Sequence, residues 1–125
     1  MMIKLADYIL FKFIDFLNDK YPTSKDVYLT VLHGNDSVKT HDDSAGWAIY
    51  SPANVNGTNK NIILLPGEVP NIEGVNKNMI LENLAHEYCH HIQNCEGRLK
   101  DNKKIETEAV EFAAMVMRRW LKRVE

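Results

Sequence analysis

The sequence has few cysteines, no long uncharged apolar run and no excess of either charge. Cys89 and Cys95 are six positions apart on a predicted helix, which separates them by about 9 Å along its axis. A disulfide needs a Cα separation below roughly 7 Å, so we expect two reduced thiols that pack as small core residues. The formal net charge of −2 excludes a broad basic surface, so direct nucleic-acid binding is not predicted.

The N-terminal residues are apolar but repeatedly interrupted by charge. Apolar side chains recur at helical spacing over 2–19, which predicts an amphipathic helix. The interrupting residues are Lys4, Asp7, Lys12 and Asp15. They exclude the uncharged core of a signal peptide and a membrane span, and no small-residue cleavage site follows. We therefore expect the mature sequence of a cytoplasmic protein without membrane contact.

Three later segments have the β-branched and aromatic composition of strands: 27–32, 46–50 and 61–65. Residues 51–60 (SPANVNGTNK) carry turn-forming Pro, Asn and Gly and are predicted to join the second and third strands as a hairpin. Residues 34–44 and 66–75 are expected to be polar loops. In the last third of the chain, apolar residues again recur at helical spacing.

Two helices are predicted there, over about 77–96 and about 102–123. Asn76 or Asn78 is the expected N-cap of the first, and Gly97 its C′ residue. Strands grouped between helices favour an α+β fold over a doubly wound sheet. We expect one domain over 1–125, with a small three-stranded, mostly antiparallel sheet packed against the N-terminal helix and the last two helices.

The first of these two helices carries His86-Glu87-Tyr88-Cys89-His90, an H-E-x-x-H sequence. Histidines four positions apart lie one turn apart on one helix face, so both imidazoles can reach a single metal ion. Glu87 projects about 100° away, from where its carboxylate can reach a metal-bound water. The pattern arises by chance in roughly one such chain in a hundred. Both histidines fall outside the apolar arc of the helix, so a merely solvated pair is the alternative.

A catalytic zinc site needs a third protein ligand and an open fourth position. The last helix offers Glu106, Glu108 and Glu111. On a helical wheel they lie about 60°, 100° and 160° from the centre of its apolar face. Glu106 is thus best placed to turn towards a neighbouring helix. The alternative is a first-turn glutamate that interacts with the helix dipole.

The sequence from His86 to His91, followed by Glu106-Thr107-Glu108-Ala109-Val110-Glu111-Phe112-Ala113, resembles the ImmA/IrrE family of zinc metallopeptidases. The resemblance covers about 27–120 and implies a gluzincin-like site with one Zn²⁺ on His86, His90 and Glu106. Val110 departs from the asparagine that the family usually carries, a residue that would help to orient a ligand.

The resemblance implies hydrolysis of a peptide bond in a specific regulatory protein, such as a DNA-binding repressor. In that reaction Glu87 is the catalytic base, and it returns the proton to the leaving amine. The oxyanion donor stays open among Tyr88, His91 and His41, although His91 lies among apolar residues and is typical of a satisfied core histidine. The strand at 61–65 is a candidate edge for binding the peptide main chain. The alternative function is a zinc-binding regulatory or toxin-like protein with little turnover.

Overall fold

The computed structural model describes residues 2–32, 38–39, 45–46, 48–55, 58–66, 68–70, 74 and 76–123. His41 and most of the predicted loop at 34–44 lie outside these residues. The three predicted helices are confirmed as α1 (Asp7–Lys20), α2 (Lys77–Cys95) and α3 (Lys103–Lys122). Together with a mixed sheet they form the expected α+β fold. None of the described helices combines the length and the hydropathy that crossing a bilayer requires.

The main sheet has the order β2 (Val27–Leu32), β6 (Thr58–Pro66), β5 (Ile49–Val55). The β5–β6 pair is antiparallel, as the predicted hairpin requires, but β2 runs parallel to β6. The sheet is therefore mixed, and the prediction of a mostly antiparallel sheet was wrong. A tight hairpin dictates the direction of its two strands, whereas the long connection after β2 leaves the direction of β2 open.

The hairpin strands are longer than predicted. Pairing extends to Val55 and Thr58, so the strands occupy most of the segment expected to be loop. The turn-forming residues of this segment did not by themselves indicate where the strands end.

Residues near the N-terminus also differ from expectation. Met2–Lys4 is a strand, β1, which pairs antiparallel with β7 (Glu68–Pro70). The first helix consequently begins at Asp7, and part of the predicted loop at 66–75 is a strand. A fourth pairing joins β3 (Val38–Lys39) to β4 (Ala45–Gly46). The β1–β7 pairing joins segments far apart in sequence, and such a pairing leaves no local pattern.

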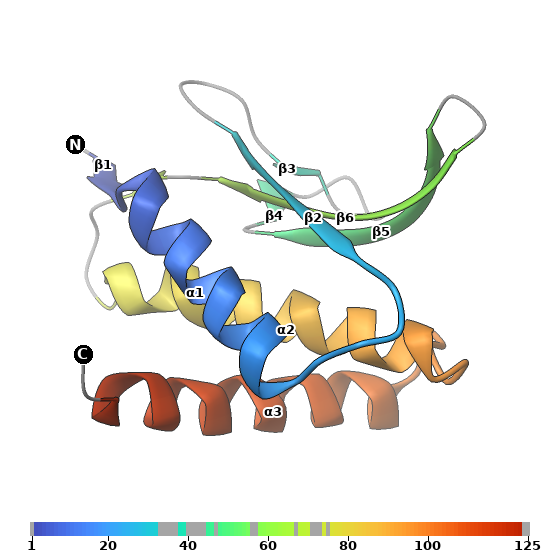
Figure 1. Ribbon diagram of the computed structural model, residues 1–125. Coiled ribbons are helices and arrows are strands. Elements are labelled where there is room, and N and C mark those ends of the chain that lie inside the picture. The colour runs from blue at the N-terminus through green and yellow to red at the C-terminus, as the bar shows by residue number, and fades with distance from the viewer. Residues whose placement is uncertain are drawn as a thin grey trace.

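Figure 1 shows the main sheet on one side of α2 and α3 on the other, with α1 crossing α2 obliquely. Helices α2 and α3 run antiparallel. Gly97, with φ of 72°, follows α2 in the left-handed region expected at C′. Asn102 begins α3, and its side chain accepts a hydrogen bond from the amide of Ile105 at 2.9 Å. The hydrophobic core contains residues from the three helices and from β6. They include Leu10, Phe13, Leu17, Ile63, Leu65, Leu84, Val116 and Trp120.

Helix α2 is the centre of this arrangement. It contacts β5 and β6 on one side, α3 on another and α1 on a third. Its polar stripe is therefore not solvated: His90 and Gln93 are both buried. A polar side chain that is buried needs a hydrogen-bonding partner, and the partners of this stripe come from α3 and β5.

Candidate metal centre

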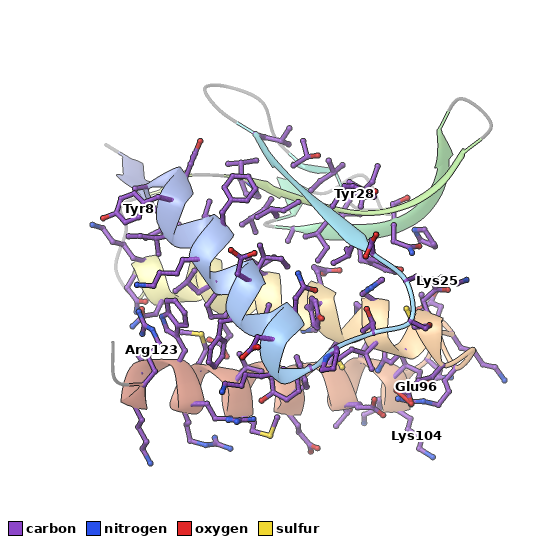
Figure 2. The ribbon with its side chains drawn as sticks, viewed as in Figure 1. Tyr8, Lys25, Tyr28, Glu96, Lys104 and Arg123 are labelled. Atoms are coloured by element: carbon purple, nitrogen blue, oxygen red, sulfur yellow. The ribbon has the colours of Figure 1, made fainter. Side chains whose placement is uncertain are left out.

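The antiparallel pairing of α2 and α3 brings the three predicted ligands together. A carboxylate oxygen of Glu106 lies 3.1 Å from Nε2 of His86, and its other oxygen lies 3.1 Å from Nε2 of His90. The potential ligand atoms of these three residues all lie within 4.8 Å of one another. Figure 2 labels Glu96 and Lys104 at the end of the molecule where α2 passes into α3.

The three side chains are of the kinds that bind a metal ion, and they lie close together. Each imidazole Nε2 is 3.1 Å from a different oxygen of Glu106. Two imidazoles and one carboxylate are also a donor set that catalytic zinc sites use, with a fourth position left for water. The group formed by His86, His90 and Glu106 can therefore hold a metal ion.

The hydrogen bond of His90 to Gln93 determines which of its ring nitrogens carries a proton. The Gln93 amide donates from Nε2 to the carbonyl of Ile105 at 3.1 Å, which leaves Oε1 to face Nδ1 of His90 at 2.8 Å. Since Oε1 only accepts, Nδ1 of His90 carries the proton. Nε2 of the neutral ring then presents a lone pair to Glu106, and the two acceptors repel each other unless a cation lies between them. A metal ion or a second proton meets that requirement.

The pKa of His86 is lower than that of an exposed histidine. Burial and the neighbouring His90 lower the pKa of His86, against the opposing effect of Glu106. A lowered pKa favours the neutral imidazole at neutral pH, and this is the form that binds a metal ion.

An open cleft of about 370 Å³ lies beside the three residues. Tyr50 of β5 and His90 and Glu106 form part of its wall, and the turn between α2 and α3 contributes Leu99, Lys100 and Asp101. A reactant can therefore approach the site from solvent. The half-exposed side chain of Glu106 agrees with this access.

Glu87 lies on the β5 side of α2, close to the three residues. Its Oε2 accepts a hydrogen bond from the main-chain amide of Tyr50 at 2.9 Å. Burial raises the pKa of Glu87 to about 7, while His90 and the Tyr50 amide act in the opposite direction. A carboxylate with a pKa near neutrality is suited to accept and return a proton.

The other two glutamates of α3 have different surroundings. Glu108 forms a two-pronged ion pair with Arg98, with N···O distances of 3.0 and 2.8 Å, and Glu111 is exposed. Of the three carboxylates, Glu106 is thus the one brought to the histidines. Val110, where the resemblance implies an asparagine, is 56% exposed.

Two of the predicted oxyanion donors have other partners. The Tyr88 hydroxyl is directed towards α1, where it bonds Asn18 at 3.0 Å and the carbonyl of Tyr21 at 2.8 Å. His91 has no exposed surface and is hydrogen-bonded through both ring nitrogens, which confirms a satisfied core histidine. The third candidate, His41, lies outside the described residues.

Both cysteines are free, as predicted. Cys89 is buried, and burial raises the pKa of its thiol to about 12. A thiol with so high a pKa stays protonated and is a poor metal ligand. Cys95 is only half-buried, so its assignment to the core was wrong for this residue. It lies 3.7 Å from Nε2 of His91.

Two residues of the site were missed by sequence reasoning. Gln93 follows His90 by three positions, a spacing that places the two side chains on one helix face, so its contact with His90 was open to prediction. Tyr50 was assigned only to a strand. Its contact with Glu87 depends on how β5 packs against α2, and no sequence signal indicates it.

Comparisons of the chain with models of protein families, with curated proteins and with solved structures found no match. The class that the fold and site define is an α+β protein with a candidate His-His-Glu metal centre. Its function has to be inferred from the chemistry of that centre.

Proposed function

We propose that this protein is a zinc-dependent metallopeptidase. The observation that carries the proposal is the convergence of His86, His90 and Glu106, with Glu87 held beside them by the amide of Tyr50. The motif residues that resemble the ImmA/IrrE family support the same reaction. Among them, Glu106 is the carboxylate that the gluzincin pattern requires as third ligand.

Each side chain of the site has a separate role in the proposed reaction. His86, His90 and Glu106 bind the ion, and Gln93 holds His90 in the tautomer that leaves Nε2 free. When bound, zinc acidifies a coordinated water towards a pKa of about 7 and polarises the scissile carbonyl. Glu87 accepts a proton from the attacking water on its carboxylate and passes it to the nitrogen of the leaving amine.

The peptide substrate is expected beside β5. The strand at 61–65 was predicted to offer an edge, but it belongs to β6, which is the central strand; the edge strand next to α2 is β5. An extended peptide would lie in the cleft that Tyr50, His90 and Glu106 line. A specific regulatory protein, such as a repressor, is the proposed target. Two free cysteines support a cytoplasmic location.

The test combines metal content with hydrolysis. Wild-type protein loaded with one equivalent of Zn²⁺ is incubated with a peptide library derived from cytoplasmic proteins, and new N-termini are identified by mass spectrometry. We expect cleavage by the wild type, and none by Glu87→Gln with its zinc retained. Cleavage that persists in Glu87→Gln would overturn the peptidase proposal. Zinc binding without any cleavage by the wild type would favour the regulatory alternative.

A further inference from the structure

We propose that Tyr50 is a positioning residue that fixes the carboxylate of Glu87 through its main-chain amide, with its own hydroxyl anchored on α2. This inference rests on the proposed function for its catalytic meaning. The contacts that carry it are all protein contacts and do not depend on a metal ion. They form two connections between β5 and α2, one at Glu87 and one at His91 and Asn94.

The first connection is the hydrogen bond from the Tyr50 amide to Oε2 of Glu87, 2.9 Å long. Tyr50 is opposite Ile63 in the antiparallel β5–β6 pair. Since its amide is directed to Glu87, this pair is one of the non-hydrogen-bonded pairs, whose main-chain groups point away from the neighbouring strand. Pro52 occupies the next such position, opposite Asn61, where β6 requires no N–H from it. The contact of the Tyr50 amide and the proline at position 52 both indicate that the main-chain nitrogens of β5 face away from β6 at these two positions.

The second connection anchors the Tyr50 side chain. Nε2 of His91 lies 2.9 Å from the carbonyl of Lys25, which only accepts, so this nitrogen carries the proton and Nδ1 is the acceptor. The Tyr50 hydroxyl therefore donates to Nδ1 of His91, at 3.1 Å. Asn94 in turn donates from Nδ2 to the Tyr50 oxygen at 3.0 Å.

The resulting chain of donors has one direction, from Asn94 to Tyr50, from Tyr50 to His91, and from His91 to Lys25. Figure 2 labels Lys25 where the chain approaches β2, so this network also joins the start of β2 to α2. The single hydroxyl proton of Tyr50 is used by His91, so Tyr50 is assigned to positioning rather than to oxyanion binding. Because both connections end on α2, the hydroxyl anchor holds β5 at the distance at which its amide meets Glu87.

The test compares two tyrosine hydroxyls that join α2 to another element, the half-buried Tyr50 of β5 and the buried Tyr88 of α2. Tyr50→Phe removes the anchor of β5, whereas the control Tyr88→Phe removes a hydroxyl that bonds α1 and the residue after it. Amide hydrogen exchange at residue 50 is measured by NMR on zinc-loaded protein. We expect exchange at residue 50 to accelerate about tenfold in Tyr50→Phe and to stay at the wild-type rate in Tyr88→Phe. Zinc affinity is expected to be unchanged in both.

For a peptide that the wild type cleaves, kcat is expected to fall about tenfold in Tyr50→Phe, with KM and zinc affinity retained. Asn94→Ala, which removes one donor to the same hydroxyl, gives a smaller change in the same direction and serves if Tyr50→Phe does not fold. Equal exchange rates at residue 50 in both tyrosine variants would overturn the inference. Accelerated exchange without any peptidase activity in the wild type would support the anchor and contradict the proposed function.

Discussion

Nε2 of His90 and a carboxylate oxygen of Glu106 face each other at 3.1 Å, although the hydrogen bond of His90 to Gln93 places the ring proton on the opposite nitrogen. Two acceptors at this distance repel each other unless a metal ion or a second proton lies between them. The polar stripe of α2 and the first turn of α3 thus form a group that could hold a metal ion.

Glu106 should dominate metal affinity among the glutamates of α3. Glu106→Gln removes one of the three proposed ligands and is expected to weaken zinc binding by more than about 100-fold, because even residues behind the ligands commonly contribute 10–100-fold. Glu108→Gln is the matched control, since Glu108 pairs with Arg98 instead. Competition with a chromophoric chelator measures both affinities. Equal losses in the two variants would contradict the assignment of Glu106.

Gln93 should support the site through His90. Gln93→Leu removes the acceptor that holds the proton on Nδ1, and we expect zinc affinity to fall about 10–100-fold. Asn83→Leu is a control on the same helix, because the Asn83 amide bonds the carbonyl of Met79 within α2. Calorimetric titration with Zn²⁺ compares the two. Wild-type affinity in Gln93→Leu would exclude the proposed orienting role.

Glu87 should affect turnover and leave metal binding intact. Glu87→Gln keeps the size of the side chain but loses its ability to accept a proton, so kcat is expected to fall by about 10²–10⁴-fold. Zinc content, measured by mass spectrometry of the purified protein, should stay at one equivalent. Loss of zinc from this variant would mean that Glu87 is itself a ligand.

The ion pair between Arg98 and Glu108 should make a small, pH-dependent contribution to stability. The hydrogen bonds from Arg98 depress the pKa of Glu108 below its ordinary value of 4.5. A depressed folded-state pKa stabilises the fold above the unfolded-state value, and the effect is lost as the pH falls through the folded-state pKa. Urea unfolding of Arg98→Ala should therefore show a slightly lower midpoint than the wild type at pH 7, with the difference vanishing in acid. Both side chains are largely exposed, which keeps the effect small.

The sequence alone determined where the helices lie and which helix carries each candidate ligand. Helical spacing of apolar residues, the cap at Asn102 and the glycine at position 97 are local features, and local structure follows from them. The spacing of His86 and His90 is likewise a property of one helix. Even the choice of Glu106 followed from the apolar face of α3, which is buried largely as the wheel predicted.

Tertiary structure decided the sheet and the surroundings of the ligands. The parallel pairing of β2 with β6 and the strand at Met2–Lys4 depend on hydrogen bonds between distant segments, and composition does not encode their partners. The tautomer of His90 depends on the carbonyl of Ile105 through Gln93, and the placement of Glu87 depends on Tyr50. A helix fixes which side chains share a face, but only packing against other elements determines which atoms those side chains meet.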